Sequence, residues 1–450
     1  MNKNYHVSEY GLIRSEQEWD VDDNVKSLKQ IYIPKDHFNS LYNFVLENQD
    51  DSDESESVFT VKTKNRRRQI KVKNHVGVVE TKDGVQLEIL PKIFYGINDF
   101  DKELNKTKQT FLKMLRYVKN SPFKSVSTAH ISSKKEFPIL EAFIHGYITE
   151  TELLIKGGLY TQYLQVCENS DYLRGRLDIT KNIRYNYLNK SKFYCLFDEY
   201  SKNININRII KTTLKKLSSI TRISANYRSI NQLLSFFDKV NESKNIQLDL
   251  SRLNSMHKSS LRFKSIIEWS KVFLENKGFT NFGGESMNMS ILFPMERVFE
   301  YYITYLFKKF SDGYSIKSQD KSYFLVEKHK MISKFRLKPD IVATSDDVDQ
   351  LIVDTKWKLI DQFKENNNYN IQQSDMYQLY AYGKKYTNND NEPLLVLLYP
   401  MNPRFTDKLN EFIYEGDLRL EVIPFNFDNN AQDEIQKILS QMGKKEYGFA

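Results

Sequence analysis

The pattern of apolar and polar positions predicts a mixed first region, residues 1–165, in this 450-residue chain. Short runs rich in β-branched residues indicate strands, and longer stretches with apolar residues every three or four positions indicate helices. The turn Lys82-Asp83-Gly84 joins two of the strands into a hairpin. The predicted strands are 31–33, 58–61, 76–80 and 85–90, and the predicted helices are 108–118 and 136–156.

Helical spacing dominates the middle region, residues 166–285, whereas helices and strands alternate in the last region, residues 286–450. The pattern therefore predicts an α+β protein of several domains: a mixed α/β region, a helical region, and a C-terminal α/β domain with a mixed central sheet. The predicted helices are 207–220, 230–240, 260–277, 295–310 and 374–386, and the predicted strands are 335–342, 351–358 and 394–399.

Composition indicates a folded protein with a mild preference for polyanions. Hydrophobic residues make up 40% of the chain and aromatic residues 13%, which argues against general disorder. The net charge of +8 suits DNA without requiring it. Two cysteines, Cys167 and Cys195, are too few for a disulfide framework or a thiolate zinc site. With no secretion signal and no apolar run near the roughly 20 residues that span a membrane, we expect a cytoplasmic protein without membrane contact.

Candidate chemistry lies in the hairpin formed by 335–342 and 351–358. A turn centred on Asp347 places Asp340 opposite Asp354. Side chains alternate along a strand, so Asp354 and Lys356 share one face and lie roughly 6–7 Å apart. Directly opposed residues also share a face, within roughly 5 Å. The sequence therefore predicts two carboxylates and one ammonium at one place.

This combination suits a divalent metal and phosphodiester hydrolysis. Mg²⁺ takes oxygen ligands and keeps several waters, so Asp340, Asp354 and the main-chain carbonyl of Thr355 would suffice. Lys356 would orient or deprotonate the attacking water, or offset charge on the phosphate. The alternative is that these charges only dot the solvent face of an amphipathic hairpin. The apolar run 351–353 predicts a buried strand, and buried charges are rare without a purpose.

Two flanking helices bring further candidates. Glu296 and Glu300 are four residues apart on one helical face, and either could supply a third carboxylate; the alternative is a pair of surface acids. Gln378 and Tyr382 also share a helical face and could touch the ligands or DNA, although an aromatic core helix explains them equally well.

These motifs resemble the PD-(D/E)xK nuclease superfamily and, over most of the chain, the McrC family of McrBC-type modification-dependent restriction systems. The resemblance rests on segments that occur in family order. They are Glu88-Ile89-Leu90-Pro91-Lys92, Leu173-Arg174-Gly175-Arg176-Leu177, Asn207-Arg208-Ile209, the segment 293–300, Leu337-Lys338-Pro339-Asp340-Ile341, the segment 353–358, and the segment 375–382.

The resemblance implies a Mg²⁺-dependent endonuclease subunit that cuts modified, methylcytosine-containing double-stranded DNA. It implies metal ligation by Asp340, Asp354, Thr355 and Glu300, and catalytic roles for Lys356, Glu296 and Gln378. It also implies an N-terminal part that engages a hexameric AAA+ GTPase of the McrB type and stimulates its GTP hydrolysis. The chain has no G-x-x-x-x-G-K-[ST] loop, which fits this division of labour. Double-strand cleavage would further suggest self-association.

Two other functions stay open at this stage: a non-catalytic adaptor of a ring NTPase, and a stand-alone repair nuclease. Three motifs are also open. Arg174-Gly175-Arg176 is either a phosphate contact or a turn that serves structure or a partner. The basic tract 62–73 is either a contact for DNA or a partner, or a charged strand edge. The acidic tract 50–57 is most simply a solvated loop.

Overall fold

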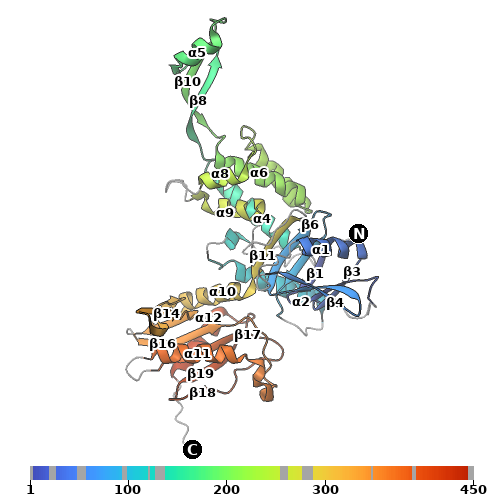
Figure 1. Ribbon diagram of the computed structural model, residues 1–450, viewed down its shortest axis with the longest axis vertical. Helices are drawn as coiled ribbons and strands as arrows, with labels where there is room; N and C mark the ends of the chain where they lie inside the picture. The colour runs from blue at the N-terminus through green and yellow to red at the C-terminus, as the bar shows by residue number, and fades with distance from the viewer. Residues whose placement is uncertain are drawn as a thin grey trace, which may run out of the picture. The chain divides into compact units, whose positions relative to one another are not determined.

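The computed structural model has an α+β architecture with strands in several sheets (Figure 1). The described residues fall into two compact units, Met1–Ile139 with Lys277–Ala450, and Leu140–Asn276. Among these residues, no helix is both long and apolar enough to cross a membrane. The structure describes residues 4–19, 27–47, 57–93, 99–119, 122–126, 137–253, 262–275, 287–345, 348–387 and 392–443.

Two four-stranded sheets and helix α1 form one hydrophobic core in the first unit. The predicted strands and the 82–84 hairpin turn are all found there. The strand β11 belongs to this sheet pair although it follows the middle region in sequence, because it pairs with β6. In spatial order the sheets are β1 (Asn4–Ser8), β7 (Gln86–Leu90), β6 (His75–Thr81) and β11 (Met287–Pro294), and β3 (Gln30–Ile33), β2 (Leu12–Ser15), β5 (Arg67–Val72) and β4 (Phe59–Lys64); the helices are α1 (Lys35–Glu47) and α2 (Phe100–Leu115).

The first unit also contains a six-stranded mixed sheet, as the sequence predicts for its last region. Three central strands run parallel, and the remaining neighbours are antiparallel. Helix α11 packs on this sheet through a second apolar core, and α10 packs against α12 (Figure 1). The order is β12 (Ser315–Ser318), β15 (Ile341–Ser345), β16 (Val348–Thr355), β17 (Leu394–Pro400), β19 (Arg419–Phe425) and β18 (Phe412–Ile413); the helices are α10 (Met295–Phe310), α11 (Gln373–Tyr386) and α12 (Ala431–Leu439), and β13 (Phe324–His329) pairs with β14 (Ile332–Arg336).

The second unit combines a helical body with a strand ribbon that the sequence prediction missed. In Figure 1 the strands β8 and β10 leave the helices α6 and α8 and carry the short helix α5 near their far end. Because most side chains on both faces of this ribbon stay at least partly exposed, its sequence lacks the apolar and polar alternation that marks a half-buried strand. The prediction of a helical middle region was therefore wrong for this part. The elements are α4 (Ile139–Lys156), β8 (Gln162–Ser170), β9 (Arg176–Leu177), α5 (Ile179–Asn186), β10 (Phe193–Ser201), α6 (Asn205–Ile220), α7 (Ser224–Ser235), α8 (Ile246–Leu253) and α9 (Lys264–Leu274).

The two units do not coincide with the predicted boundaries at 165 and 285. Helix α4 and the start of β8 fall in the second unit, and β11 pairs within the first. The bounds of two C-terminal helices agree more closely with the prediction. Helix α10 spans the predicted residues, and α11 begins one residue earlier than predicted.

Candidate active site

The hairpin β15–β16 has the register that the sequence predicts at its open end. Ile341 pairs with Val353, and Val342 pairs with Ile352. Near the turn the register shifts by one, because an irregularity follows Ala343. The turn on Asp346 and Asp347 lies outside the described residues. This irregularity restores the predicted pairing toward the open end of the hairpin. Residue 340 therefore lies beside residue 354.

Asp340 comes directly before β15, and its carboxylate contacts the end of β16. The main-chain N–H and the hydroxyl of Thr355 both donate to Asp340 Oδ2, at 2.8 and 2.7 Å. The side chain of Gln319 donates to Asp340 Oδ1 at 3.2 Å and to Glu300 Oε1 at 2.6 Å. Gln319 therefore links Glu300 of α10 to Asp340, a role for which the sequence gives no motif.

Asp354 lies near the end of β16, and its side chain is buried. Lys356 Nζ lies 2.6 Å from Asp354 Oδ2 and donates to Gln378 Oε1 at 2.8 Å. Gln378 of α11 in turn donates to the hydroxyl of Tyr382 at 2.7 Å. Of the predicted pair on α11, Gln378 thus contacts the lysine, and Tyr382 contacts Gln378. A further carboxylate, Asp375, lies 4.0 Å from Lys356 Nζ and was missed by sequence reasoning because it has no recognisable spacing to the hairpin.

The electrostatics of the site disfavour several negative charges together. Burial raises the pKa of Asp354 to about 7, and the charge of Asp340 adds to this effect. Burial and Glu300 raise the pKa of Asp340 to about 6, and burial raises the pKa of Glu300 as well. Although burial works against it, the neighbouring carboxylates, Asp354 first, raise the pKa of Lys356. Such mutually perturbed groups are typical of functional sites.

The donor set fits a magnesium ion with few protein ligands. Carboxylate and carbonyl oxygens are the ligands that Mg²⁺ prefers, and one or two carboxylates are enough when waters complete the octahedron. Asp354 Oδ2 has no hydrogen-bond partner among the described residues apart from its ion pair with Lys356. Within the same described ranges, no three His, Cys, Asp or Glu side chains group closely enough to hold a metal by themselves. The set Asp340, Asp354 and the Thr355 carbonyl therefore remains a prediction.

The two glutamates of α10 lie in different surroundings. Glu300 is half-buried and interacts with Asp354 and Lys356. Glu296 is exposed, and its charge acts on Lys92 instead. Burial lowers the pKa of Lys92, whereas the charges of Glu9 and Glu296 raise it. The structure thus brings Glu300, and not Glu296, to the two aspartates.

The motif Arg174-Gly175-Arg176 forms a turn in the second unit. Gly175 has φ +66, and a Cβ there would lie 2.6 Å from the carbonyl oxygen of Leu196, so the position requires glycine. The guanidinium of Arg174 lies 3.9 Å from the ring centroid of Phe197. This geometry agrees with the turn interpretation.

The basic tract and the acidic tract differ in what can be said of them. The basic tract lies on the β4–β5 hairpin, and its side chains at 62, 64, 66 and 67 are exposed. Residues 50–56 of the acidic tract lie outside the described residues.

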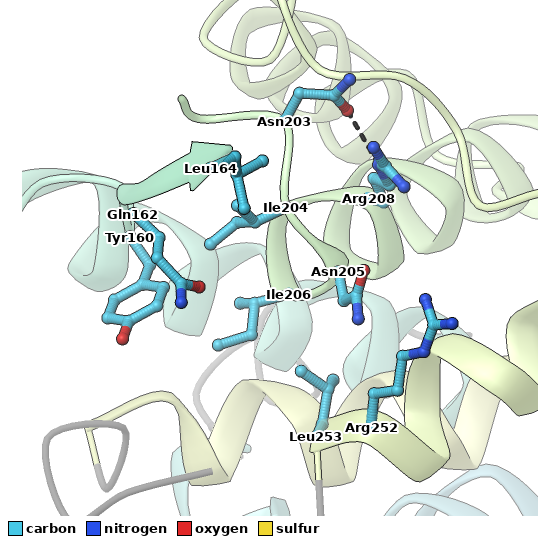
Figure 2. A pocket seen from close by; sticks show the side chains of 10 residues that line it. All are labelled: Tyr160, Gln162, Leu164, Asn203, Ile204, Asn205, Ile206, Arg208, Arg252 and Leu253. Carbon is cyan, nitrogen blue, oxygen red and sulfur yellow. Dashed lines mark hydrogen bonds between the residues drawn. The ribbon is translucent and has the colours of Figure 1, made fainter. Parts of the chain in front are cut away.

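A pocket of about 430 Å³ lies at the base of the ribbon in the second unit, where Arg208 donates to Asn203 at 2.8 Å (Figure 2). None of the candidate site residues lines it. The motif residue Asn207 is buried beside it and ties the ribbon to α6, because its side chain donates to the carbonyls of Tyr160 and Lys202 at 2.8 and 2.7 Å. The pocket is lined by Tyr160, Gln162, Leu164, Asn203, Ile204, Asn205, Ile206, Arg208, Arg252 and Leu253.

Comparison with known proteins places the chain in a family. A solved structure described as Thermococcus gammatolerans McrB AAA+ hexamers with bound McrC aligns with 98% of this chain and 100% of its own matched chain, at TM-score 0.70 and 16% identity, which shows a shared fold. A cryo-EM structure of the McrBC complex from the same organism aligns with 69% of this chain and 89% of its own, at 18% identity; its TM-score of 0.49 adds nothing to the assignment. No curated protein sequence matches. The family model for the McrBC 5-methylcytosine restriction system component matches residues 70–400, and the chain therefore belongs to this family.

Proposed function

We propose that this chain is the McrC-type nuclease subunit of a cytoplasmic, GTPase-driven restriction system that cuts methylcytosine-containing double-stranded DNA. The observation that carries the proposal is the convergence of Asp340, Asp354 and Lys356 at the end of β16, with Glu300 and Gln378 beside them. A PD-(D/E)xK-type site has this composition, and the surrounding mixed sheet with α10 and α11 agrees with such a domain.

In the proposed reaction, Mg²⁺ when bound would polarise a phosphoryl oxygen and lower the pKa of water. Asp340, Asp354 and the carbonyl of Thr355 would hold the ion. The donated hydrogen bonds from Thr355 fix the Asp340 carboxylate, so its orientation does not depend on the ligand. Lys356 would then orient the attacking water or offset negative charge on the phosphate, and Gln378 holds its ammonium in place.

The partner in this proposal is a hexameric AAA+ GTPase of the McrB type. The similar solved structure contains McrB AAA+ hexamers with bound McrC, and the present chain lacks the phosphate-binding loop of such a motor. We propose that the N-terminal region 1–165 engages that partner, as the resemblance implies. We further propose that the ribbon of the second unit also contacts it, because large apolar side chains are exposed there and such patches mark protein interfaces. They are Tyr163, Tyr172, Leu173, Ile179, Ile183, Tyr185, Tyr187, Leu188 and Tyr200.

A non-catalytic adaptor is the main competing function. An adaptor has no need for a buried Asp354 and a partly buried Asp340 whose pKa values are raised by burial and by their neighbours. Keeping such charges costs stability unless a cation joins them.

Double-strand cleavage would require two copies of the site. We therefore also propose that the chain self-associates.

The substitution Asp354→Ala tests the proposal in the presence of the partner GTPase. We expect loss of cleavage of methylated duplex DNA together with unchanged stimulation of GTP hydrolysis. Normal cleavage by this variant would overturn the site assignment. A wild-type protein that stimulates the GTPase but cuts none of several modified DNAs would favour the adaptor, and partner-free cutting of plain DNA would favour a stand-alone nuclease.

A further inference from the structure

Two residues outside the candidate site, Glu9 and Lys92, reach the residue that follows the site lysine. Glu9 directly follows β1, and Lys92 lies two residues after the parallel neighbouring strand β7, in which Leu90 pairs with Ser8. The main-chain N–H of Glu9 donates to the carbonyl of Leu90 at 2.8 Å, which continues this pairing. Because both strands end at the same edge of the sheet, the two side chains emerge together.

Both side chains bind Trp357. The indole N–H of Trp357 donates to Glu9 Oε1 at 2.5 Å, and the main-chain N–H of Lys92 donates to the same oxygen at 3.1 Å. Lys92 Nζ donates to the main-chain carbonyl of Trp357 at 3.2 Å. Its distance to Glu9 Oε2 is 3.7 Å. Residues that follow β1 and β7 thus bind both the indole N–H and the main-chain carbonyl of Trp357.

These contacts determine where the chain runs after β16. The main-chain N–H of Lys356 donates to the carbonyl of Leu398 on β17 at 2.9 Å. This hydrogen bond fixes the backbone of Lys356 on its N-terminal side. Trp357 fixes the backbone of Lys356 on the C-terminal side. Besides its hydrogen bonds, the buried ring of Trp357 packs against Phe299 of α10, with 5.3 Å between the ring centroids. Lys356 is therefore held between two anchors.

We propose that Glu9 and Lys92 are positioning residues that set the place of the Lys356 ammonium through Trp357. This inference rests on the nuclease function proposed above. Glu9 is only 1% exposed, and a buried carboxylate is costly unless it is well paired. A buried ion pair that served stability alone would be replaceable by apolar residues, whereas this one satisfies two polar groups beside the site. Displacement of a catalytic group by about 1 Å can lower a rate about 100-fold.

A double-mutant cycle with Glu9→Leu, which removes the acceptor of the indole N–H, and Trp357→Phe, which removes its donor, tests the proposal in the complete chain with its GTPase partner. We expect each substitution to lower kcat for DNA cleavage about tenfold while the KM for DNA stays unchanged. If Glu9 acts through the indole N–H, the double variant falls about tenfold as well, and not about 100-fold.

Glu88→Leu is the matched control. Glu88 is a fully buried carboxylate of β7 in the same sheet, but its partners are His6, Lys108 and the main-chain N–H of Ile139. We expect this variant to melt at a lower temperature and to keep the kcat of the folded protein.

Four results would count against the inference in distinguishable ways. A normal kcat in Glu9→Leu, or a roughly 100-fold loss in the double variant, would overturn the positioning role and leave the nuclease proposal intact. An equal fall of kcat in Glu88→Leu would show that sheet stability alone controls activity, which also overturns it. A wild-type complex that cuts no DNA would overturn the proposed function itself.

Discussion

Replacing Asp354 by Asn should stabilise the protein when no divalent metal is present. In the folded chain the Asp354 carboxyl is buried beside Asp340, and its pKa is about 7, compared with 3.8 for an ordinary aspartate. Between these values the unfolded chain ionises freely while folded Asp354 resists ionisation. Stability therefore falls as the pH rises through this window, and the full cost is present above pH 7.

The difference of about 3 pKa units corresponds to about 4 kcal/mol, at about 1.4 kcal/mol per unit. This value already includes the opposing attraction of Lys356, whose Nζ lies 2.6 Å from Asp354 Oδ2, because that attraction lowers the pKa of Asp354. Asparagine removes the cost of ionisation, and Lys356 retains Gln378 as its acceptor. We therefore expect a gain of about 4 kcal/mol for Asp354→Asn at pH 8.

The assay is urea unfolding with a metal chelator at pH 8 and at pH 4, followed by pH 8 with excess Mg²⁺. The gain should be present at pH 8 and largely absent at pH 4, where folded Asp354 is protonated. Mg²⁺ at about 100 times its Kd should stabilise the wild type by about 2.7 kcal/mol and should not stabilise the variant. A variant that is less stable than the wild type at pH 8 without metal would refute this reasoning.

Three further predictions follow from other parts of the chain. Lys108→Met should lower the free energy of unfolding by about 3–5 kcal/mol, because it leaves the buried Glu88 carboxylate, 2.7 Å away, without its charged partner. Burial alone would raise the pKa of Glu88, but Lys108 and His6 lower it to about 2. In urea titrations the stabilising contribution of Glu88 should therefore be lost as the pH falls from about 4.5 toward 2. Glu300→Gln should weaken Mg²⁺-dependent cleavage at least tenfold, whereas Glu296→Gln should leave it unchanged, and equal effects in cleavage assays would contradict the assignment of Glu300. Leu188→Asp should abolish stimulation of the partner GTPase without changing the melting temperature, because the side chain is 94% exposed on the ribbon; normal stimulation would exclude that surface.

The sequence predicts the core of the site because the site is local in the chain. A hairpin register relates Asp340 to Asp354 over a few residues, and helical spacing relates Gln378 to Tyr382. Centring the turn on Asp347 gives the observed pairing at the open end only because an irregularity near the turn shifts the register by one residue. Such an irregularity has no clear sequence signal here.

The remaining contacts depend on tertiary structure. Glu9 and Trp357 are 348 residues apart, and no periodicity connects them. Gln319 has φ +50 in a loop after β12 and carries no motif. The ribbon β8–β10 was missed because most side chains on both of its faces stay at least partly exposed, so its pattern differs from that of a sheet on a core. Choosing Glu300 over Glu296 likewise required knowing how α10 rotates against β16.

Whether Asp340 and Asp354 form a Mg²⁺-dependent nuclease site is tested by single-turnover cleavage of methylcytosine-containing duplex DNA. The chain is assayed with its GTPase partner across a Mg²⁺ titration, beside the variant Asp340→Ala. We expect no product with chelator, saturable cleavage as Mg²⁺ rises, and no cleavage by the variant at any Mg²⁺ concentration. Cleavage that persists with chelator, or that survives Asp340→Ala, would contradict this expectation.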